Sequence, residues 1–348
     1  MKDLKLPILA LMMCILSACT GGGGGTSTNE THTIYVLNNG DESISQYQSV
    51  GGVITPMITA KQPTGSYPVA MVLTPSGKSA YVANAGDDTI SQYAIGSDGE
   101  LVPINLPVVT GSFPQALVVS PNGQYLYSVN KQDDNVTRYE IATDGSLTNL
   151  GNIGGLNFPI NMTFNTTGSY AYIVNAGDDS IAQFAVATDG TLTSLSPATV
   201  AASACPTGPL GTAKTNGGEF IFTVSCMTDQ VEVFKIGSDG TLTSQQTIAT
   251  GVRPTSIKVQ GSYVYVTNSN DASVSMYALA NDGTLTDLTP GTTLVGEFPE
   301  SIATKGNMAF VVDGMSLLIP LTISNDGSLI QQATGQTTGL GPIQVLVK

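Results

Sequence analysis

The feature that most constrains the fold is a pattern that recurs about every 45 residues from Thr33 to the end of the chain. Each repeat holds an apolar run with an aromatic residue, a turn rich in Asn and Asp, an alternating run, a Gly-containing turn and an x-Pro step. The aromatic residues of the first run are Tyr35, Tyr81, Tyr127, Tyr172, Phe222, Tyr265 and Phe310, separated by 46, 46, 45, 50, 43 and 45 residues. Such a period indicates a repeat architecture, here with seven units.

Each unit is expected to contain four short β-strands. Runs such as Thr89-Ile90-Ser91-Gln92-Tyr93 combine β-branched and aromatic residues between turn residues. Gly51-Gly52 in the first unit and an Asp-Gly pair in each later one supply the positive φ angles of tight hairpins. The Asp-Gly pairs begin at Asp98, Asp144, Asp189, Asp239, Asp282 and Asp326. With charged residues at 11%, 39 Gly and 18 Pro, the composition also favours an all-β fold.

The two chain ends distinguish a closed ring from an open solenoid. The first repeat begins at its second strand, Ile34 to Leu37, whereas the chain finishes with an x-Pro first strand, Pro342 to Val347, that has no second strand after it. A solenoid would instead have polar capping repeats at its ends. We therefore predict a seven-bladed β-propeller over residues 33–348, closed by the C-terminal strand joining the N-terminal blade.

The first 18 residues are typical of a secretory signal peptide. Lys2 and Lys5 precede an apolar run that ends at Leu16 and is too short to span a bilayer. The sequence Leu16-Ser17-Ala18-Cys19 resembles the lipobox of bacterial lipoproteins, which implies cleavage before Cys19 and lipid attachment to its thiol. Cys19 would then be the membrane contact of the mature protein, with residues 19–32 as a Gly-rich tether.

The resemblance to bacterial lipoproteins also implies an address in the cell envelope. Thr20 follows the lipid-bearing Cys and is not Asp, which in a diderm bacterium favours the outer membrane. Whether the propeller would face the periplasm or the cell surface stays open. We expect no nucleic-acid partner, because the net charge is −14 and the basic residues are scattered along the chain.

Within the repeats, Tyr263-Val264-Tyr265-Val266-Thr267-Asn268 is similar to the signature of YVTN-type propeller repeats. Variants recur in register at Tyr81–Asn84 and Tyr172–Asn175, and Pro114–Gly123 matches the x-Pro step followed by a Pro-Asn-Gly turn. The chain resembles the lactonase-type propeller family, which includes 6-phosphogluconolactonase-like and muconate-cycloisomerase-like enzymes. The resemblance implies the fold more specifically than the function, because such propellers serve many roles.

A catalytic role finds little support among the residues. Enzymes of the resembled family are expected to use His, Arg and Glu around the channel mouth, but this chain has a single His, His32. We expect His32 to be a surface or disordered residue at the tether junction. No Ser-His-Asp or Cys-His set and no zinc motif can be assembled from the sequence.

Acidic residues recur in the turns between the second and third strands, as in Asp87-Asp88 and Asp133-Asp134. An acidic ring there could bind Ca²⁺, but Asn and Asp in such turns usually bond to nearby backbone, and recurrence in nearly every blade favours a fold role. Loops of adjacent blades also diverge from the axis, whereas Ca²⁺ needs six or more converging oxygens. We therefore predict no metal and no cofactor.

Candidate ligand contacts are the residues that depart from the repeat. Arg253 precedes Pro254 where most blades have an aromatic residue, Glu297 and Glu300 flank Phe298-Pro299, Lys131 replaces Ala or Asn, and Asp313 stands where Asn is usual. These departures fall on the predicted ligand face, although surface salt bridges or solvated loops are the more common meaning of such residues. Arg253 and Glu300 come from adjacent blades.

Cys205 and Cys226 are expected to form a disulfide. Cys205 precedes the first strand of blade five and Cys226 follows its second strand, so antiparallel pairing would bring the two to one end of the hairpin. An oxidising compartment would permit the bond, and two buried free thiols are the alternative.

Three classes of function follow from these features. The first is a binding or scaffold module displayed from the membrane, with an unknown protein or small-molecule ligand. The second is a lactonase-like hydrolase, which would need a converging set such as Arg253, Glu300 and Asp313. The third is a structural component of an envelope assembly, for which an exposed apolar patch on the ring would be evidence. The lack of a catalytic constellation favours the first.

Overall fold

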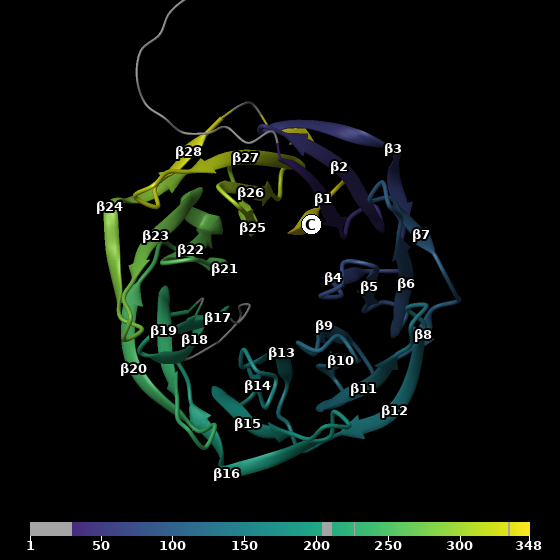
Figure 1. Cartoon of the computed structure of the whole chain (residues 1–348), viewed down its shortest axis with the longest axis vertical. Helices are drawn as coiled ribbons and strands as arrows, with labels where there is room; N and C mark the ends of the chain where they lie inside the picture. The colour runs from purple at the N-terminus through teal and green to yellow at the C-terminus, as the bar shows by residue number, and fades with distance from the viewer. Residues whose placement is uncertain (1–29, 204–210, 226, 333–334) are drawn as a thin grey trace, which may run out of the picture.

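Seven antiparallel sheets surround a central axis in a computed structural model that describes residues 30–203, 211–225, 227–332 and 335–348 (Figure 1). Each sheet is a blade whose first strand lies nearest the axis and whose fourth strand lies at the rim. The predicted seven-bladed β-propeller is thereby confirmed.

The blades are formed as follows. Blade 1 contains β30 (Pro342–Val347), β1 (Thr31–Asn38), β2 (Ser43–Val50) and β3 (Val53–Pro63). Blade 2 contains β4 (Pro68–Leu73), β5 (Ser79–Asn84), β6 (Thr89–Ile95), β7 (Leu101–Pro103) and β8 (Val108–Val109), and blade 3 contains β9 (Pro114–Val119), β10 (Tyr125–Asn130), β11 (Asn135–Ile141) and β12 (Leu147–Ile153). Blade 4 contains β13 (Pro159–Phe164), β14 (Tyr170–Asn175), β15 (Ser180–Val186) and β16 (Leu192–Ala201).

The remaining blades repeat this order. Blade 5 contains β17 (Gly211–Thr215), β18 (Gly218–Ser225), β19 (Gln230–Ile236) and β20 (Leu242–Ala249). Blade 6 contains β21 (Pro254–Gln260), β22 (Tyr263–Asn268), β23 (Ser273–Leu279) and β24 (Leu285–Leu294), with a 3-10 turn, η1 (Ser269–Asp271), after β22. Blade 7 contains β25 (Pro299–Lys305), β26 (Met308–Asp313), β27 (Leu317–Ile323), β28 (Leu329–Gln331) and β29 (Gln336–Thr337).

The ring closes by pairing the two ends of the propeller, as the sequence predicts. The C-terminal strand β30 runs antiparallel to β1, with Tyr35 opposite Leu346 and Val36 opposite Val345. Their backbone pairing supplies the first strand that blade 1 would otherwise lack. Closure therefore removes two strand edges that could pair with other chains.

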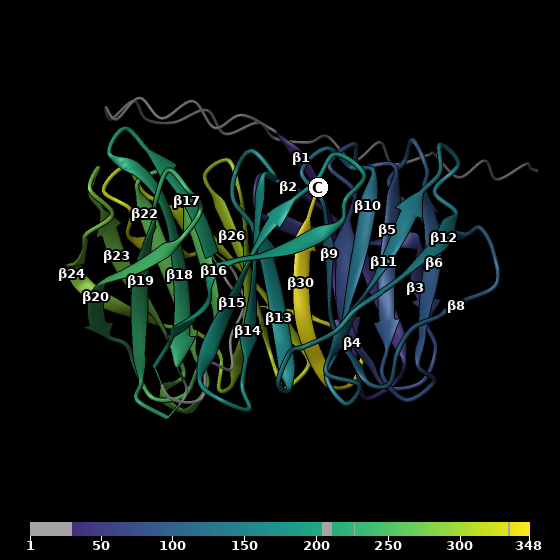
Figure 2. The same cartoon turned by 90° about the horizontal axis from the view of Figure 1, so that it is seen from below.

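The two faces of the ring carry different loops (Figure 2). We call the mouth face the one that holds the second-to-third strand loops and the loops that precede each first strand. The hairpin face holds the turns between the first and second strands and the Gly-containing hairpins between the third and fourth. Strand β1 starts at the hairpin face, where β30 also ends, so both described chain ends lie opposite the mouth face.

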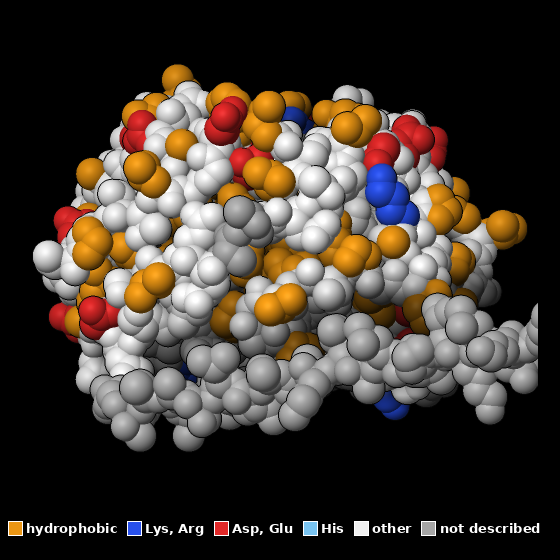
Figure 3. Space-filling view, turned by 90° about the horizontal axis from the view of Figure 1, so that it is seen from above, with side chains coloured by type: hydrophobic (Ala, Val, Ile, Leu, Met, Phe, Trp, Pro, Cys, Tyr) orange, Lys and Arg blue, Asp and Glu red, His pale blue; other side chains and the backbone are white. Residues whose placement is uncertain are grey.

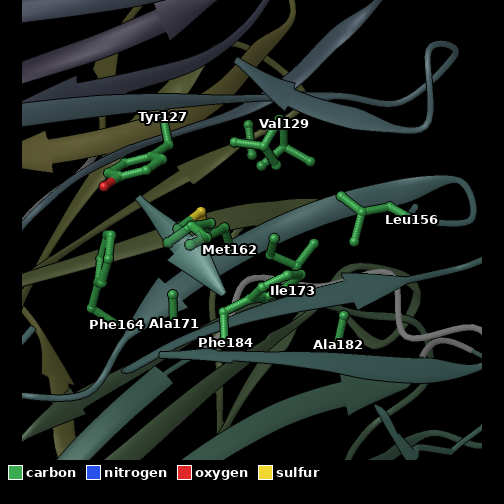
Figure 4. Packing of buried hydrophobic residues seen from close by; sticks show 12 residues of the cluster. Tyr127, Val129, Leu156, Met162, Phe164, Ala171, Ile173, Ala182 and Phe184 are labelled. Atoms are coloured by element: carbon green, nitrogen blue, oxygen red, sulfur yellow. The ribbon is translucent and has the colours of Figure 1, made fainter. Parts of the chain in front are cut away.

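Hydrophobic contacts between neighbouring blades form the core. Between blades 3 and 4, Tyr127 lies against Phe164, and Met162 and Ile173 fill the same layer (Figure 4). Equivalent clusters occur between the other blades. Each blade buries its faces only against its two neighbours, which explains why strands are apolar on both faces near the axis.

A buried tyrosine hydroxyl joins successive blades at five places. The Tyr81 hydroxyl of β5 donates to the Gly145 carbonyl in the hairpin of the next blade at 2.7 Å. The other donors at this position of the repeat are Tyr35, Tyr127, Tyr172 and Tyr265. Phe222 and Phe310 occupy the position in blades 5 and 7. The aromatic anchors of the repeat thus connect blades as well as fill them.

One expectation near the N-terminus is wrong. His32 is neither on the surface nor disordered: it lies inside β1, is 5% exposed, and contacts the Phe310 ring edge-on at a centroid distance of 6.4 Å. The strand begins at Thr31, two residues before the expected start, so Thr31 and His32 belong to the propeller. Burial lowers the pKa of His32, with Lys305 acting in the same direction and Glu30 against it.

Candidate functional site

A collar of large side chains surrounds the mouth of the central channel. In five blades the residue just before the first-strand proline is aromatic or Arg, and we call these five residues the collar: Tyr67, Phe113, Phe158, Arg253 and Phe298. Tyr67, Phe158 and Phe298 are exposed, and the Tyr67 and Phe113 rings lie 6.1 Å apart. Figure 3 shows the ring from its side, where hydrophobic side chains lie between acidic and basic groups.

Four collar residues have an unfavourable backbone conformation. Tyr67, Phe113, Phe158 and Arg253 have φ angles of 51°, 56°, 51° and 57°, in the left-handed region that bulky residues rarely adopt. Blade 1 has Gly341 at this position, with φ 57°, which shows that glycine satisfies the same turn. Retaining bulky residues costs about 1 kcal/mol or more at each position, and such strain often marks a ligand site.

Acidic residues of the adjacent blades hold the collar in place. Asp88 accepts a hydrogen bond from the Phe113 amide at 2.7 Å, and Asp134 accepts one from the Phe158 amide at 2.6 Å. Asp229 does the same for the Arg253 amide at 2.8 Å. The carboxylates of these turns therefore bind backbone groups, as expected from the sequence. The amides that they bind lie in the next blade as well as in their own.

The channel below the collar contains a cavity of about 340 Å³ lined by the first strands. Glu300 is the one charged residue among its described lining residues, which otherwise present apolar and amide or hydroxyl side chains. Burial raises the pKa of Glu300, while Ser269 and Arg253 act against that shift. A half-buried carboxylate thus faces the cavity.

Arg253 and Glu300 are brought together through a serine from η1. Ser269 Oγ donates to Glu300 Oε1 at 3.1 Å, and Arg253 Nη1 donates to Ser269 Oγ at 3.5 Å. The pair comes from adjacent blades, as expected, and Ser269 is a member of the site that sequence reasoning missed. No sequence signal singled out Ser269, because its role depends on where η1 places it.

Lys131 lies among the collar aromatics. Its ammonium is 4.4 Å from the centroid of the Phe158 ring and 5.6 Å from that of Phe113. Both distances are within the range of cation–π attraction. Lys131 therefore belongs to the mouth, as its departure from the repeat suggested.

The other two candidates differ in their surroundings. Glu297 is exposed beside the collar. Asp313 is fully buried, and its carboxylate accepts hydrogen bonds from the Glu297 and Met315 amides. In blade 2, Asn84 likewise accepts a hydrogen bond from the Gly65 amide, so Asp313 takes over the loop-holding role of the asparagines. Each carboxylate oxygen of Asp313 therefore binds a backbone amide of its own blade.

Two further predictions fall on residues outside the described ones: lipid attachment at Cys19 and the Cys205–Cys226 disulfide. Within the described part of the chain, no group of three or more His, Cys, Asp or Glu residues is arranged to hold a metal ion. That part also contains no helix with the length and apolar character needed to cross a membrane.

Comparison with known proteins supports the architecture. A family model described as "Lactonase, 7-bladed beta-propeller" matches residues 28–159 and 159–299. A candidate 6-phosphogluconolactonase from Bacteroides fragilis superposes with a TM-score of 0.80 at 19% identity, covering 94% of this chain and 100% of that one. A periplasmic gluconolactonase from Pseudomonas aeruginosa superposes with a TM-score of 0.76 at 17% identity, covering 91% and 99%. No curated protein matches the sequence.

Proposed function

This chain belongs to the lactonase, seven-bladed β-propeller family, and we propose that it is a membrane-anchored envelope lipoprotein whose propeller acts as a binding module. The observation that carries the proposal is the collar, where bulky side chains are kept exposed in a strained conformation around a cavity. Concave sites with aromatic walls and a few polar groups are the usual form of ligand pockets.

The position of the chain ends supports display from a membrane. Cys19 precedes β1 by 12 residues, and β1 starts at the hairpin face. A lipid on Cys19 would therefore hold the propeller from the hairpin face and leave the mouth face turned toward its ligand. We expect Cys19→Ser to move the protein from the membrane fraction to the soluble fraction, and continued membrane retention would contradict the anchor.

The binding role is tested with a photo-crosslinking amino acid placed on either face. We expect adducts in intact cells when it replaces Tyr67 or Phe298 in the collar. The matched control is Val53, which is exposed on the hairpin face. Equal adducts from Val53, or no adduct from either collar position, would contradict a binding function of the mouth.

A second candidate function, lactone hydrolysis, is favoured by the Glu300–Ser269–Arg253 arrangement. Glu300 can accept a proton from water as the water oxygen attacks the lactone carbonyl carbon, and Arg253 can stabilise the resulting oxyanion. The ring C–O bond then breaks, and the proton passes from Glu300 to the leaving alkoxide to give the hydroxy acid. The raised pKa of Glu300 suits this role as a base.

The hydrolase alternative is tested by a panel of lactones, including gluconolactone, with the mature protein. If it is correct, Glu300→Gln lowers turnover about 100-fold or more, as expected for loss of a general base. Asp313→Asn is a useful comparison, because it preserves the size of a buried loop residue and removes a carboxylate that the hydrolysis does not use. If no lactone is hydrolysed, the hydrolase alternative is rejected and the binding function remains.

A further inference from the structure

Exposed apolar side chains extend beyond the collar and lie around most of the mouth face. Seven exposed large hydrophobic residues lie in its loops: Tyr67, Phe158, Met227, Val252, Phe298, Met315 and Leu340. Monomeric proteins rarely expose such grouped apolar surface without a partner. The residues come from six of the seven blades, which is a wider surface than a small molecule in the channel would cover.

The same face holds most of the net charge of the propeller. Its loops and strand ends contain thirteen acidic residues: Asp41, Glu42, Asp87, Asp88, Asp133, Asp134, Asp178, Asp179, Asp229, Asp271, Glu297, Glu300 and Asp313. They are accompanied by three basic residues, Lys61, Lys131 and Arg253, which gives a formal charge of −10. Residues 30–348 contain 25 acidic and 10 basic residues, a charge of −15, so the rest of the propeller has only −5. Such asymmetry attracts a cationic partner and raises its rate of association.

The collar already accommodates one ammonium group. Lys131 Nζ lies against the rings of Phe113 and Phe158, from two different blades. The other aromatic collar residues, Tyr67 and Phe298, present exposed rings to solvent. The chain's own lysine thus shows that ammonium groups fit between aromatic residues of this mouth.

The cavity contains a matching carboxylate. Glu300 faces the cavity, and Ser269 donates to its Oε1. Among the ion pairs of the described residues, none joins Arg253 to Glu300 within 4.0 Å. A cavity of about 340 Å³ has room for an extended lysine or arginine side chain. Its charged end would reach Glu300 while its methylene groups pass the aromatic collar.

From these four observations we propose that the mouth face binds a basic protein segment. Its apolar side chains contact the ring of exposed hydrophobic residues, and one lysine or arginine side chain enters the cavity toward Glu300. This inference rests on the proposed binding function and specifies the chemistry of the partner. It also explains why the mouth combines aromatic residues with excess negative charge.

The test measures binding of a short synthetic peptide that alternates leucine and lysine to the mature protein. We expect Glu300→Gln and Phe158→Ala each to weaken binding about tenfold or more, as for central contacts of an interface. Affinity should also fall as salt is raised, because charged groups are screened. Val53→Ala and Asp144→Asn, both on the hairpin face, are matched controls that should bind like the wild type. Thermal melting of each variant confirms that it is folded.

Two results with the peptides would overturn the inference, and a third would come from the variants. One is equal binding of a peptide in which glutamate replaces lysine, and the other is failure of the lysine peptide to bind at all. Neither result bears on the crosslinking experiment at Tyr67 and Phe298, so the binding function could stand while the basic character of the partner is rejected. Undiminished binding by both Glu300→Gln and Phe158→Ala would likewise reject the mouth as the place of binding.

Discussion

Removing one inter-blade hydroxyl, by Tyr81→Phe, should destabilise the propeller measurably. Tyr81 is fully buried, and its hydroxyl donates at 2.7 Å to the carbonyl of Gly145, which is also buried. The substitution keeps the ring and leaves that carbonyl without this donor. Loss of one partner from a buried pair costs about 1–3 kcal/mol.

The expected change in melting temperature follows from the size of the propeller. At about 2.1 cal/mol/K per residue, unfolding a domain of roughly 315 residues has an entropy of about 0.7 kcal/mol/K. A loss of 1–3 kcal/mol then lowers the melting temperature by about 1.5–4.5 °C. Calorimetry, together with urea unfolding followed by circular dichroism, measures both quantities.

The matched control is Tyr67→Phe, which removes the same hydroxyl from an exposed ring of the collar. We expect it to change the free energy of unfolding by less than about 0.5 kcal/mol. A second removal, Tyr172→Phe, is two blades away and should add to Tyr81→Phe within about 0.5 kcal/mol. The reasoning is refuted if Tyr81→Phe is as stable as Tyr67→Phe.

Three other changes have expected outcomes. Glu300→Gln should raise the free energy of unfolding at neutral pH, because burial raises the pKa of Glu300 and makes its charged form costly in the folded state. Thermal melts should show this gain in stability at pH 7 but not at pH 4, and an equal gain at both pH values would contradict the prediction. His32→Phe should reduce the loss of stability as pH falls below about 6.5, because burial lowers the pKa of His32 and the unfolded chain therefore binds the proton at a higher pH than the folded chain does. An unchanged dependence of stability on acid pH would contradict this. Deletion of Pro342–Lys348 should open the ring and cause aggregation, because β1 loses its partner strand; a soluble truncation that melts like the full chain would contradict the closure argument.

The repeat predicted most of the fold because each of its parts has a local physical cause. The glycines of the hairpins, such as Gly99 and Gly145, have positive φ as their Asp-Gly pairs predicted. Ring closure was also predictable, since an orphan first strand at one chain end and a missing first strand at the other leave one pairing. The position of His32 was not, because a single polar residue next to a Gly-rich segment gives no periodic signal.

For the site, sequence identified the residues that depart from the repeat but not what surrounds them. Arg253, Glu300 and Lys131 lie at the mouth. The Asp313 carboxylate instead accepts hydrogen bonds from two backbone amides. The collar aromatics Phe113 and Phe158 were visible as a recurring residue before proline. Recurrence made them look like part of the scaffold, and only their φ angles and exposure reveal the strain.

The sequence by itself determined the number of blades, the strand order and the way the ring closes, because local turn chemistry and a 45-residue period specify them without reference to distant contacts. The tertiary structure decided which side chains meet: Ser269 between Arg253 and Glu300, Lys131 between two rings, and thirteen carboxylates on one face. These groups are far apart in the chain and belong to different repeats. Only bending seven equivalent units into one ring brings their loops to a common mouth.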